Sequence, residues 1–110
     1  MEKLVKGDVV VLPFPYSDLS SSKKRPALII AILEGDDILL CQITSRQRDD
    51  KYVINLKDSD FEQGKLNLDS YIRPNRIFTA DKSIVLYKIG SLKEKKSSEV
   101  IESIINVLKQ

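Results

Sequence analysis

Short runs of β-type residues follow one another along most of this 110-residue chain, and only its last part has helical periodicity. β-Branched and other apolar residues fill segments 8–14, 25–33 and 38–44, with turn-forming residues between them. No helical segment separates these runs, which disfavours a parallel sheet built from βαβ units. The sequence therefore predicts a single domain over residues 1–110, mainly β, with a small, strongly bent antiparallel sheet or partly open barrel.

The segment 25–33 is apolar on both faces, which predicts a central strand. The turn at 34–37 joins it to 38–44 as a hairpin. Pro13 cannot donate to a ladder, so the first strand either ends there or lies at an edge. Further strands are predicted at 52–56, 66–72, 76–79 and 84–89, with an interruption at Pro74-Asn75, a turn or helical turn within 58–64 and a helical turn near 81–83.

The C-terminal segment has the spacing of an amphipathic helix, predicted from about residue 93 to 108. Its stripe consists of Ser97, Val100, Ile101, Ile104, Ile105 and Leu108. Ser91 and Glu94 have the spacing of a capping box. The stripe is too short for a sustained coiled-coil seam, so packing against the sheet is favoured.

Composition excludes several kinds of chemistry. The chain has no histidine, which rules out histidine-based metal sites, Ser-His-Asp and Cys-His nucleophile systems and paired-histidine ribonuclease chemistry. The single cysteine, Cys41, lies in an apolar run and is predicted to be a buried, inert thiol. The 18 basic and 16 acidic side chains leave a net charge of +2, so a nucleic-acid site would have to be a local arrangement.

No apolar run approaches the ~20 residues needed to span a bilayer, and the N-terminus lacks the apolar region of a signal peptide. A cytoplasmic protein without membrane association is therefore expected. Nothing in the sequence calls for a cofactor.

One stretch combines cations with a rigid strand. Lys23-Lys24-Arg25-Pro26 runs directly into the apolar segment 27–32, so the two lysines are expected on a loop and Arg25 where that loop meets the strand. A guanidinium is planar, always charged and bidentate toward phosphate. Pro26 biases the backbone of Arg25 toward an extended conformation. From these residues alone, Arg25 is either a phosphate ligand or an ordinary surface arginine.

Several segments resemble the PemK/MazF family of toxins. They are Gly-Asp-Val-Val at 7–10, Lys-Arg-Pro-Ala-Leu-Ile-Ile at 24–30, Gln-Ile-Thr-Ser at 42–45, Ser-Tyr-Ile-Arg at 70–73 and Thr-Ala-Asp-Lys at 79–82. The resemblance extends from Gly7 into the C-terminal helix. It implies an SH3-like β-barrel of the CcdB/PemK type with a terminal α-helix, usually as a homodimer. It also implies the toxin of a type II toxin–antitoxin system, a metal-independent endoribonuclease (mRNA interferase) inhibited by a cognate antitoxin.

The resemblance assigns catalytic roles to Arg25 and Thr44. Thr44 ends the strand 38–44, so the hairpin is expected to bring it opposite Arg25. Its hydroxyl can hydrogen-bond the scissile phosphate or the 2′-oxygen, and an ordinary strand threonine is the alternative. Arg73 matches an arginine that some members use at the active site. Asn75 stands where those members have a carboxylate; it cannot ionise, but it can bind a base edge.

Six more residues are predicted to contact RNA or to support the site: Tyr16, Lys23, Lys24, Ser45, Arg46 and Ser70. The lysines would meet neighbouring phosphates, Tyr16 would stack on bases and Ser45 would assist Thr44. Ser70 would support the site or the dimer. Asp49 and Asp50 partly offset the basic residues around Arg46, so a solvated loop is an equal alternative there.

The expected reaction is cleavage of single-stranded mRNA at specific sequences. The 2′-hydroxyl would attack, leaving a 2′,3′-cyclic phosphate and a 5′-hydroxyl. Two other functions fit the same residues. One is a barrel that binds RNA or a protein without catalysis, and the other is a gyrase-directed toxin of the same fold.

Overall fold

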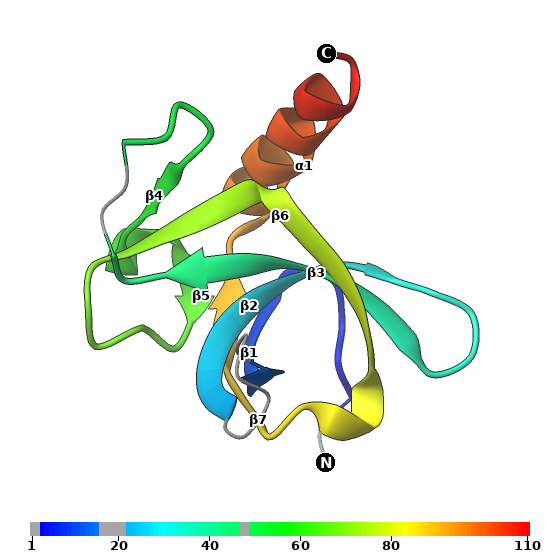
Figure 1. Cartoon of the computed structure of the whole chain (residues 1–110). Coiled ribbons are helices and arrows are strands. Elements are labelled where there is room, and N and C mark those ends of the chain that lie inside the picture. Colours follow the sequence, from blue (N-terminus) through cyan, green and yellow to red (C-terminus); the bar gives the residue numbers. More distant parts are fainter. Residues whose placement is uncertain (1–2, 16–21, 47–48) are drawn as a thin grey trace.

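The computed structural model describes residues 3–15, 22–46 and 49–110, which form one antiparallel sheet and one long helix (Figure 1). The strands are β1 (Asp8–Pro15), β2 (Ser22–Ile32), β3 (Asp37–Thr44), β4 (Ile54–Leu56), β5 (Phe61–Gln63), β6 (Ser70–Asp81) and β7 (Tyr87–Leu92). The single-turn 3₁₀ helices η1 (Asp58–Asp60) and η2 (Lys82–Ile84) precede β5 and β7, and α1 (Glu94–Leu108) ends the fold. None of these described helices has the length and apolar character needed to cross a membrane.

The seven strands are ordered β4-β6-β3-β2-β1-β7-β5, and every pair of neighbours is antiparallel. β4 and β5 are the two edges of this sheet, which curls into a half-barrel without closing (Figure 1). The mainly β fold with a C-terminal helix is therefore as predicted, and β2 and β3 lie inside the sheet. Their central position explains why both strands are apolar on two faces.

Alternation along the strands gives the sheet two apolar faces. The face toward α1 buries Val9, Leu28, Ile30, Cys41, Ile43, Ile54, Leu56, Phe61, Ile72, Leu92, Val100 and Ile104. The opposite face buries Leu4, Val10, Leu12, Ala27, Ile29, Ile38, Leu40, Ala80 and Val85. Each fully buried Leu, Ile or Val side chain stabilises the fold by roughly 1.5–3 kcal/mol. Because an apolar cluster occupies each face of the sheet, polar side chains lie mainly where the strands end.

The helix follows the predicted bounds closely, but its cap does not. α1 begins at Glu94 with Lys93 as the N-cap residue, and no side chain caps it. Ser91 belongs to β7 and pairs with Asp8, so the predicted capping box is wrong. Ser97, Val100 and Ile104 are buried against the sheet, which confirms the predicted packing for this part of the stripe, whereas Ile105 and Leu108 are exposed.

Several predicted strand boundaries are also wrong. The strand expected from residue 66 begins only at Ser70, and the strand expected at 84–89 lies at 87–92, after η2. β2 begins before the two lysines rather than after them. It does so because β1 continues past Pro13 and supplies partners, with Pro13 opposite Lys24 and Phe14 opposite Lys23. β7 pairs with β1 only at residues 8–11, so Pro13 lies beyond that ladder, as expected for an edge position.

β6 is not interrupted at Pro74. Cys41 pairs with Ile77, whereas the next residue, Gln42, pairs with Arg73, so three residues of β6 form a bulge. Pro74 has no N–H to donate to the ladder, and the bulge accommodates it within a continuous strand. The predicted break is thus a bulge, and β6 spans both β3 and β4.

Cys41 is fully buried beneath α1. Burial raises the pKa of its thiol to about 12. The thiolate is therefore absent at neutral pH, in agreement with the prediction of an inert cysteine.

β5 lies against β7 through two glycines. A Cβ at Gly90 would meet the backbone of Gln63 and Gly64, and a Cβ at Gly64 would meet the carbonyl of Ile89. These neighbours are backbone atoms held in a ladder, so they cannot move aside as a flexible side chain would.

We predict that Gly90→Ala lowers the free energy of unfolding by about 3 kcal/mol, because its methyl group overlaps backbone atoms. Gly35→Ala is the control: its Cβ would meet nothing, and only its positive φ of 74° is strained, which costs about 1 kcal/mol. Guanidinium unfolding followed by circular dichroism measures both changes. A Gly90→Ala protein as stable as Gly35→Ala would contradict the close approach.

Candidate functional site

The strand registers bring three polar side chains to one face of the sheet. Leu12 pairs with Arg25 in the β1–β2 ladder, and Ala27 pairs with Gln42 in the β2–β3 ladder. Side chains two positions apart share a face, so Arg25 lies on the side of Ala27 and Thr44 on the side of Gln42. This is the face opposite α1, at the end of its apolar cluster. Arg25, Gln42 and Thr44 thus form a polar area that adjoins the apolar cluster on this face of the sheet.

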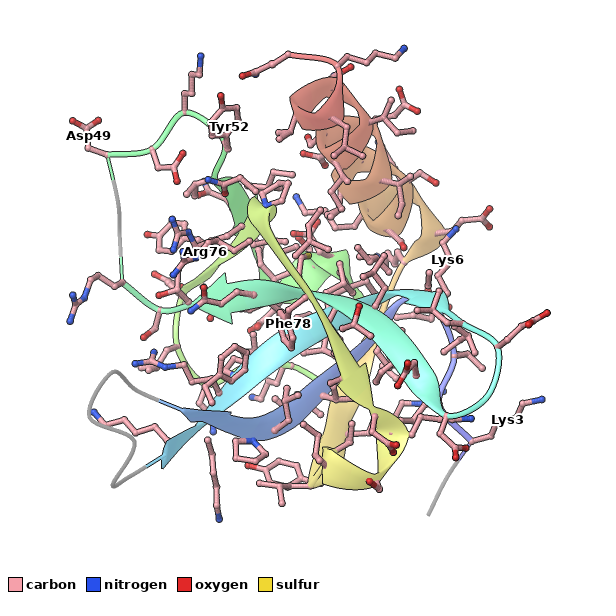
Figure 2. The ribbon with its side chains drawn as sticks, turned by 45° about the vertical axis from the view of Figure 1, so that its right-hand side comes forward. Lys3, Lys6, Asp49, Tyr52, Arg76 and Phe78 are labelled. Carbon is pink, nitrogen blue, oxygen red and sulfur yellow. The ribbon has the colours of Figure 1, made fainter. Side chains whose placement is uncertain are left out.

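An open groove with a volume of about 1060 Å³ lies over these residues. Its lining consists of Leu12, Pro13, Phe14, Arg25, Gln42, Thr44, Ser45, Arg46, Asn75, Arg76, Ile77, Phe78, Thr79, Ala80 and Ile84. Three of these residues are arginines and none is acidic. Figure 2 shows Arg76 and Phe78 along β6, where it crosses β3. The groove therefore has a cationic end and an apolar end.

Two aromatic rings form the apolar end. Phe14 and Phe78 meet edge to face, with ring centroids 5.0 Å apart and planes at 74°. Both rings are half-buried and pack against the apolar cluster on this face of the sheet. Because they pack on each other, the rings present a fixed wall to the groove.

Arg25 and Thr44 share the groove without forming a ladder pair. The β2–β3 pairs end at Ala27 and Gln42, two positions before the predicted pairing of Arg25 with Thr44. Pro26 stands in the gap and has no N–H to donate. Both side chains nevertheless line the groove, Arg25 from the middle of β2 and Thr44 from the end of β3.

The Thr44 hydroxyl is held in place by the backbone. The side chain is only 4% exposed, and its Oγ1 accepts a hydrogen bond of 3.1 Å from the N–H of Arg46. This local turn fixes the oxygen and leaves the hydroxyl hydrogen to serve as a donor. Thr44 is thus a preoriented donor on the groove wall.

The β6 bulge contributes two groove residues, Asn75 and Arg76. The Nε of Arg76 donates to the Oε1 of Gln42 at 3.5 Å. Bulges commonly redirect side chains beside functional sites. The sequence prediction missed Gln42 and Arg76 as groove residues, and the signal that could have found Arg76 is Pro74, directly before the bulged pair.

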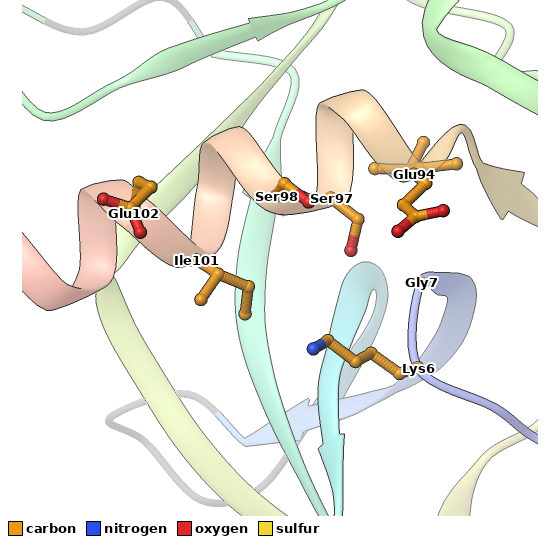
Figure 3. A pocket seen from close by; sticks show the side chains of 8 residues that line it. Lys6, Gly7, Glu94, Ser97, Ser98, Ile101 and Glu102 are labelled. Carbon is orange, nitrogen blue, oxygen red and sulfur yellow. The ribbon is translucent and has the colours of Figure 1, made fainter.

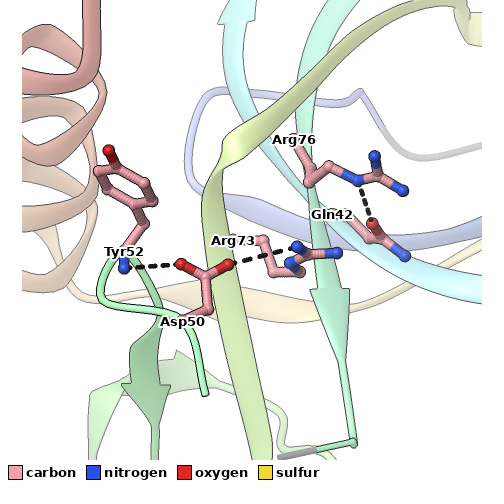
Figure 4. Close-up of polar contacts among 5 residues, drawn as sticks. All are labelled: Gln42, Asp50, Tyr52, Arg73 and Arg76. Carbon is pink, nitrogen blue, oxygen red and sulfur yellow. Dashed lines mark hydrogen bonds and ion pairs between the residues drawn. The ribbon is translucent and has the colours of Figure 1, made fainter. Parts of the chain in front are cut away.

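Arg73 is buried, is not part of the groove lining, and pairs with Asp50 (Figure 4). The Nη2 of Arg73 is 3.3 Å from the Oδ2 of Asp50, and the two side chains are 10% and 17% exposed. Asp50 also accepts a 2.9 Å hydrogen bond from the N–H of Tyr52 and a side-chain hydrogen bond from Asn75. Asp50, another residue that the sequence prediction missed, therefore ties the 49–53 loop to β6.

The donors around Asp50 hold the pKa of its carboxyl below the usual aspartate value. The hydrogen bond from the Tyr52 N–H is the largest cause, followed by the hydrogen bond and charge of Arg73 and the hydrogen bond from Asn75. Asp50 is consequently ionised at neutral pH and partly offsets the charge of Arg73. The Nε of Arg73 and the Oδ1 of Asn75 are both buried without a hydrogen-bond partner among the described residues.

We predict that Asp50→Asn destabilises the protein near pH 7 and much less at low pH. A depressed native pKa contributes stability above the unfolded value of about 3.9, and this contribution is lost as the pH falls through the native pKa. Urea unfolding of both proteins between pH 7 and pH 2 measures the difference. A constant difference across that range would mean that the charge of Asp50 contributes nothing.

The other predicted residues separate into distinct environments. Lys23 and Lys24 are exposed on β2, and Arg46 and Ser45 are exposed just after β3. Ser70 is 5% exposed and its Oγ donates to the Leu68 carbonyl at 2.9 Å, so it supports a loop. Tyr16 lies outside the described residues.

Arg25 and Ser45 also line a second hollow of about 250 Å³, together with Lys24, Pro26, Ile43, Leu66, Asn67, Leu68 and Ser70. Arg25 therefore stands between two depressions. Of the residues predicted to contact RNA, Lys24 and Ser70 line only this smaller one, and Lys23 lines neither.

A third hollow of about 480 Å³ lies between Gly7 and the first turns of α1 (Figure 3). Glu94 and Glu102 contribute two carboxylates, whereas Lys6 contributes one amine. None of the predicted site residues lines it. Its acidic character is unsuited to an RNA backbone, and the candidate site is the groove beside Arg25.

Comparison with a family model shows which protein family the chain belongs to. Residues 5–108 match the model of the PemK-like, MazF-like toxin of type II toxin–antitoxin systems. The chain belongs to this family. The match includes Arg25, Thr44 and the whole groove, and it bears out the resemblance seen in the sequence. A search of curated proteins found no match.

Solved structures share the fold of this PemK/MazF-like chain at low sequence identity. A MazE–MazF structure from Deinococcus radiodurans (Form-II) is 16% identical, with a TM-score of 0.78 and 99% of each chain covered. An endoribonuclease in complex with its cognate antitoxin, from a mycobacterial species, is also 16% identical, with a TM-score of 0.77, covering 97% of this chain and 96% of the other. Mycobacterium tuberculosis toxin MazF-mt6 is 19% identical, with a TM-score of 0.67, covering 91% and 96%.

Proposed function

We propose that this PemK/MazF-like chain is a toxin that cleaves single-stranded mRNA at specific sequences without a metal ion. The observation that carries the proposal is the groove in which a guanidinium, Arg25, and an oriented hydroxyl, Thr44, lie on one wall. The absence of acidic side chains from its described lining favours a polyanionic ligand. Solved structures with this fold that are named as endoribonucleases give further support.

The proposed reaction begins with attack of the 2′-oxygen on the adjacent phosphorus. The 2′-hydroxyl loses its proton, the bond from phosphorus to the 5′-oxygen breaks, and that oxygen gains a proton. The products are a 2′,3′-cyclic phosphate and a 5′-hydroxyl. Because the described lining lacks carboxylates and the chain lacks histidine, stabilisation of phosphorane charge is the main contribution of the protein.

Arg25 would place two N–H groups on the non-bridging phosphate oxygens, where negative charge grows in the transition state. Thr44 would donate its hydroxyl hydrogen to the phosphate or to the attacking 2′-oxygen. Arg46 and Arg76 would neutralise neighbouring phosphates. Arg73 would act through Asp50 and Asn75 rather than by direct contact, because it is buried and does not line the groove.

Partners follow from the same proposal. Relatives have been solved as MazE–MazF and as an endoribonuclease with its cognate antitoxin, and a cognate antitoxin is expected for this chain as well. A cationic groove is a suitable surface for an acidic inhibitor segment, which would exclude RNA. A homodimer in the cytoplasm remains the predicted state of the free toxin.

Arg25→Ala is predicted to lower the rate of RNA cleavage by at least 10²-fold, because one charged transition-state donor contributes about 2.7–4 kcal/mol. Arg25→Lys should be intermediate, since it retains charge but loses the bidentate geometry. Lys3→Ala is the control, because Lys3 is exposed on a remote part of the surface and its replacement removes the same charge (Figure 2).

The assay uses purified toxin freed of antitoxin, a long mixed-sequence RNA and EDTA, with product ends identified by sequencing. Equal cleavage by Arg25→Ala and wild type would remove Arg25 from the mechanism. Failure of the folded wild type to cleave any RNA would refute the proposed function. Inhibition of gyrase-dependent supercoiling by that protein would then favour the gyrase-directed alternative, and RNA binding alone the non-catalytic one.

Thr44→Val is predicted to preserve the fold and to lower kcat about tenfold or more, because the hydroxyl donor is lost while the shape of the side chain is kept. Thr79→Val, at the apolar end of the same groove, should have a much smaller effect. Single-turnover cleavage measures the effect on catalysis, and thermal unfolding measures the effect on stability. An undiminished kcat for Thr44→Val would show that Thr44 has only a structural role in β3.

A further inference from the structure

We propose that the smaller hollow beside Arg25 is a nucleobase subsite, and that Leu68 and Asn67 determine which base it accepts. The base would belong to the nucleotide that adjoins the scissile phosphate. This inference rests on the proposed cleavage of RNA at Arg25. It assigns part of the RNA-binding site to the hollow, which lies on the other face of the strands from the groove.

Arg25 is the link between the two depressions. Arg25 and Ser45 line both the groove and the hollow, whereas Pro26 and Ile43 line only the hollow. Successive residues of a strand point to opposite faces, so the hollow opens on the face toward α1 and the groove on the other. A phosphate held at Arg25 therefore has one depression on each side. An RNA strand that crosses the strand end there places neighbouring nucleotides over different faces.

The lining of the hollow suits a planar base. Ile43 is fully buried beneath it, and Pro26 and Leu66 are half-buried. Leu68 stands at the rim with 67% of its surface exposed. Small-molecule sites typically combine apolar walls with a few polar groups that fix orientation. At about 250 Å³ the hollow has room for one ring system rather than a larger ligand.

Asn67 supplies the polar group that can distinguish bases. Its amide offers both donors and an acceptor, which match the edges of adenine, guanine, cytosine and uracil differently. Ser45 adds a hydroxyl from the Arg25 side. Lys24 and Arg25 place two cations at the hollow, and this charge favours a nucleotide over an apolar protein segment.

The loop that carries Leu68 and Asn67 is anchored at both ends. At one end Gly64 is held against the backbone of Ile89 and Gly90. At the other end the buried Ser70 donates its hydroxyl to the Leu68 carbonyl at 2.9 Å. A loop fixed in this way loses little conformational entropy when a base binds. Ser70 thus positions Leu68 through this hydrogen bond.

The test is cleavage of an RNA library with a randomised segment, with sequencing of the 5′-hydroxyl ends. Wild-type protein should show a base preference at the nucleotide adjoining the cut. Leu68→Ala, which removes apolar contact with the base, and Asn67→Ala, which removes hydrogen-bonding groups, should each reduce that preference about tenfold and leave preferences at other positions intact. Matched controls are Leu108→Ala and Asn106→Ala, both exposed on α1.

A second measurement distinguishes loss of base recognition from a general loosening of the loop. An RNA oligonucleotide with an abasic nucleotide at the preferred position should lose about tenfold in kcat/KM with wild type. With Leu68→Ala the same abasic substitution should have little further effect, whereas Leu68→Met should restore the preference. These couplings would not arise if the variants only loosened the loop.

Two outcomes overturn the inference and remain distinguishable. If wild type cleaves but Leu68→Ala and Asn67→Ala give the profiles of the α1 controls, the subsite is wrong and the proposed function stands. If wild type leaves every RNA intact, the proposed function fails and the subsite fails with it. Weakened binding of a purified antitoxin by Leu68→Ala, with an unchanged cleavage profile, would assign the hollow to the inhibitor instead.

Discussion

The pairing of β2 with β1 on one side and β3 on the other determines where each polar group of the groove lies. Leu12 opposite Arg25 and Ala27 opposite Gln42 set the alternation on the two ladders. A shift of either ladder by one residue would turn Arg25 from the groove toward α1 and expose the buried residues of β2. The two apolar clusters prevent that shift, because each takes alternate residues of the same strand. The geometry of the site is thus maintained by core packing rather than by contacts among its polar groups.

Two irregularities of the described sheet involve a proline, and both lie at the groove; other register shifts occur between Val9 and Val10, between Ile29 and Ala31, and between Phe61 and Gln63. Pro26 stands where the β2–β3 ladder ends, so Arg25 and Thr44 lie just beyond the last pair of that ladder. Pro74 begins the bulge that brings Asn75 and Arg76 to the lining. Both irregularities thus place residues of the groove lining where the ladder with β3 is interrupted.

The sequence predicted the parts of the fold that local patterns encode: the central strand, its hairpin with β3, the C-terminal helix and its packing face. It misplaced elements whose limits depend on distant partners. Ser91 fits a capping box locally, but pairing with Asp8 keeps it in β7. The predicted hairpin of the second and third strands placed Arg25 close to Thr44. Both residues line the same groove, which agrees with that prediction. Asp50 was missed because its partner, Arg73, is 23 residues away and no spacing rule links the two.

The contacts of Asp50 also explain how this groove can lack a carboxylate and still have an ordered bulge. Asn75 cannot ionise, so it adds no negative charge to a lining with three arginines. Asp50 supplies negative charge outside the groove lining, where it pairs with Arg73 and accepts a hydrogen bond from Asn75. An aspartate within the groove would repel a phosphate backbone, whereas one outside it leaves the attraction of Arg25, Arg46 and Arg76 intact. The described lining of the groove therefore carries positive charge without a carboxylate, which suits an anionic ligand.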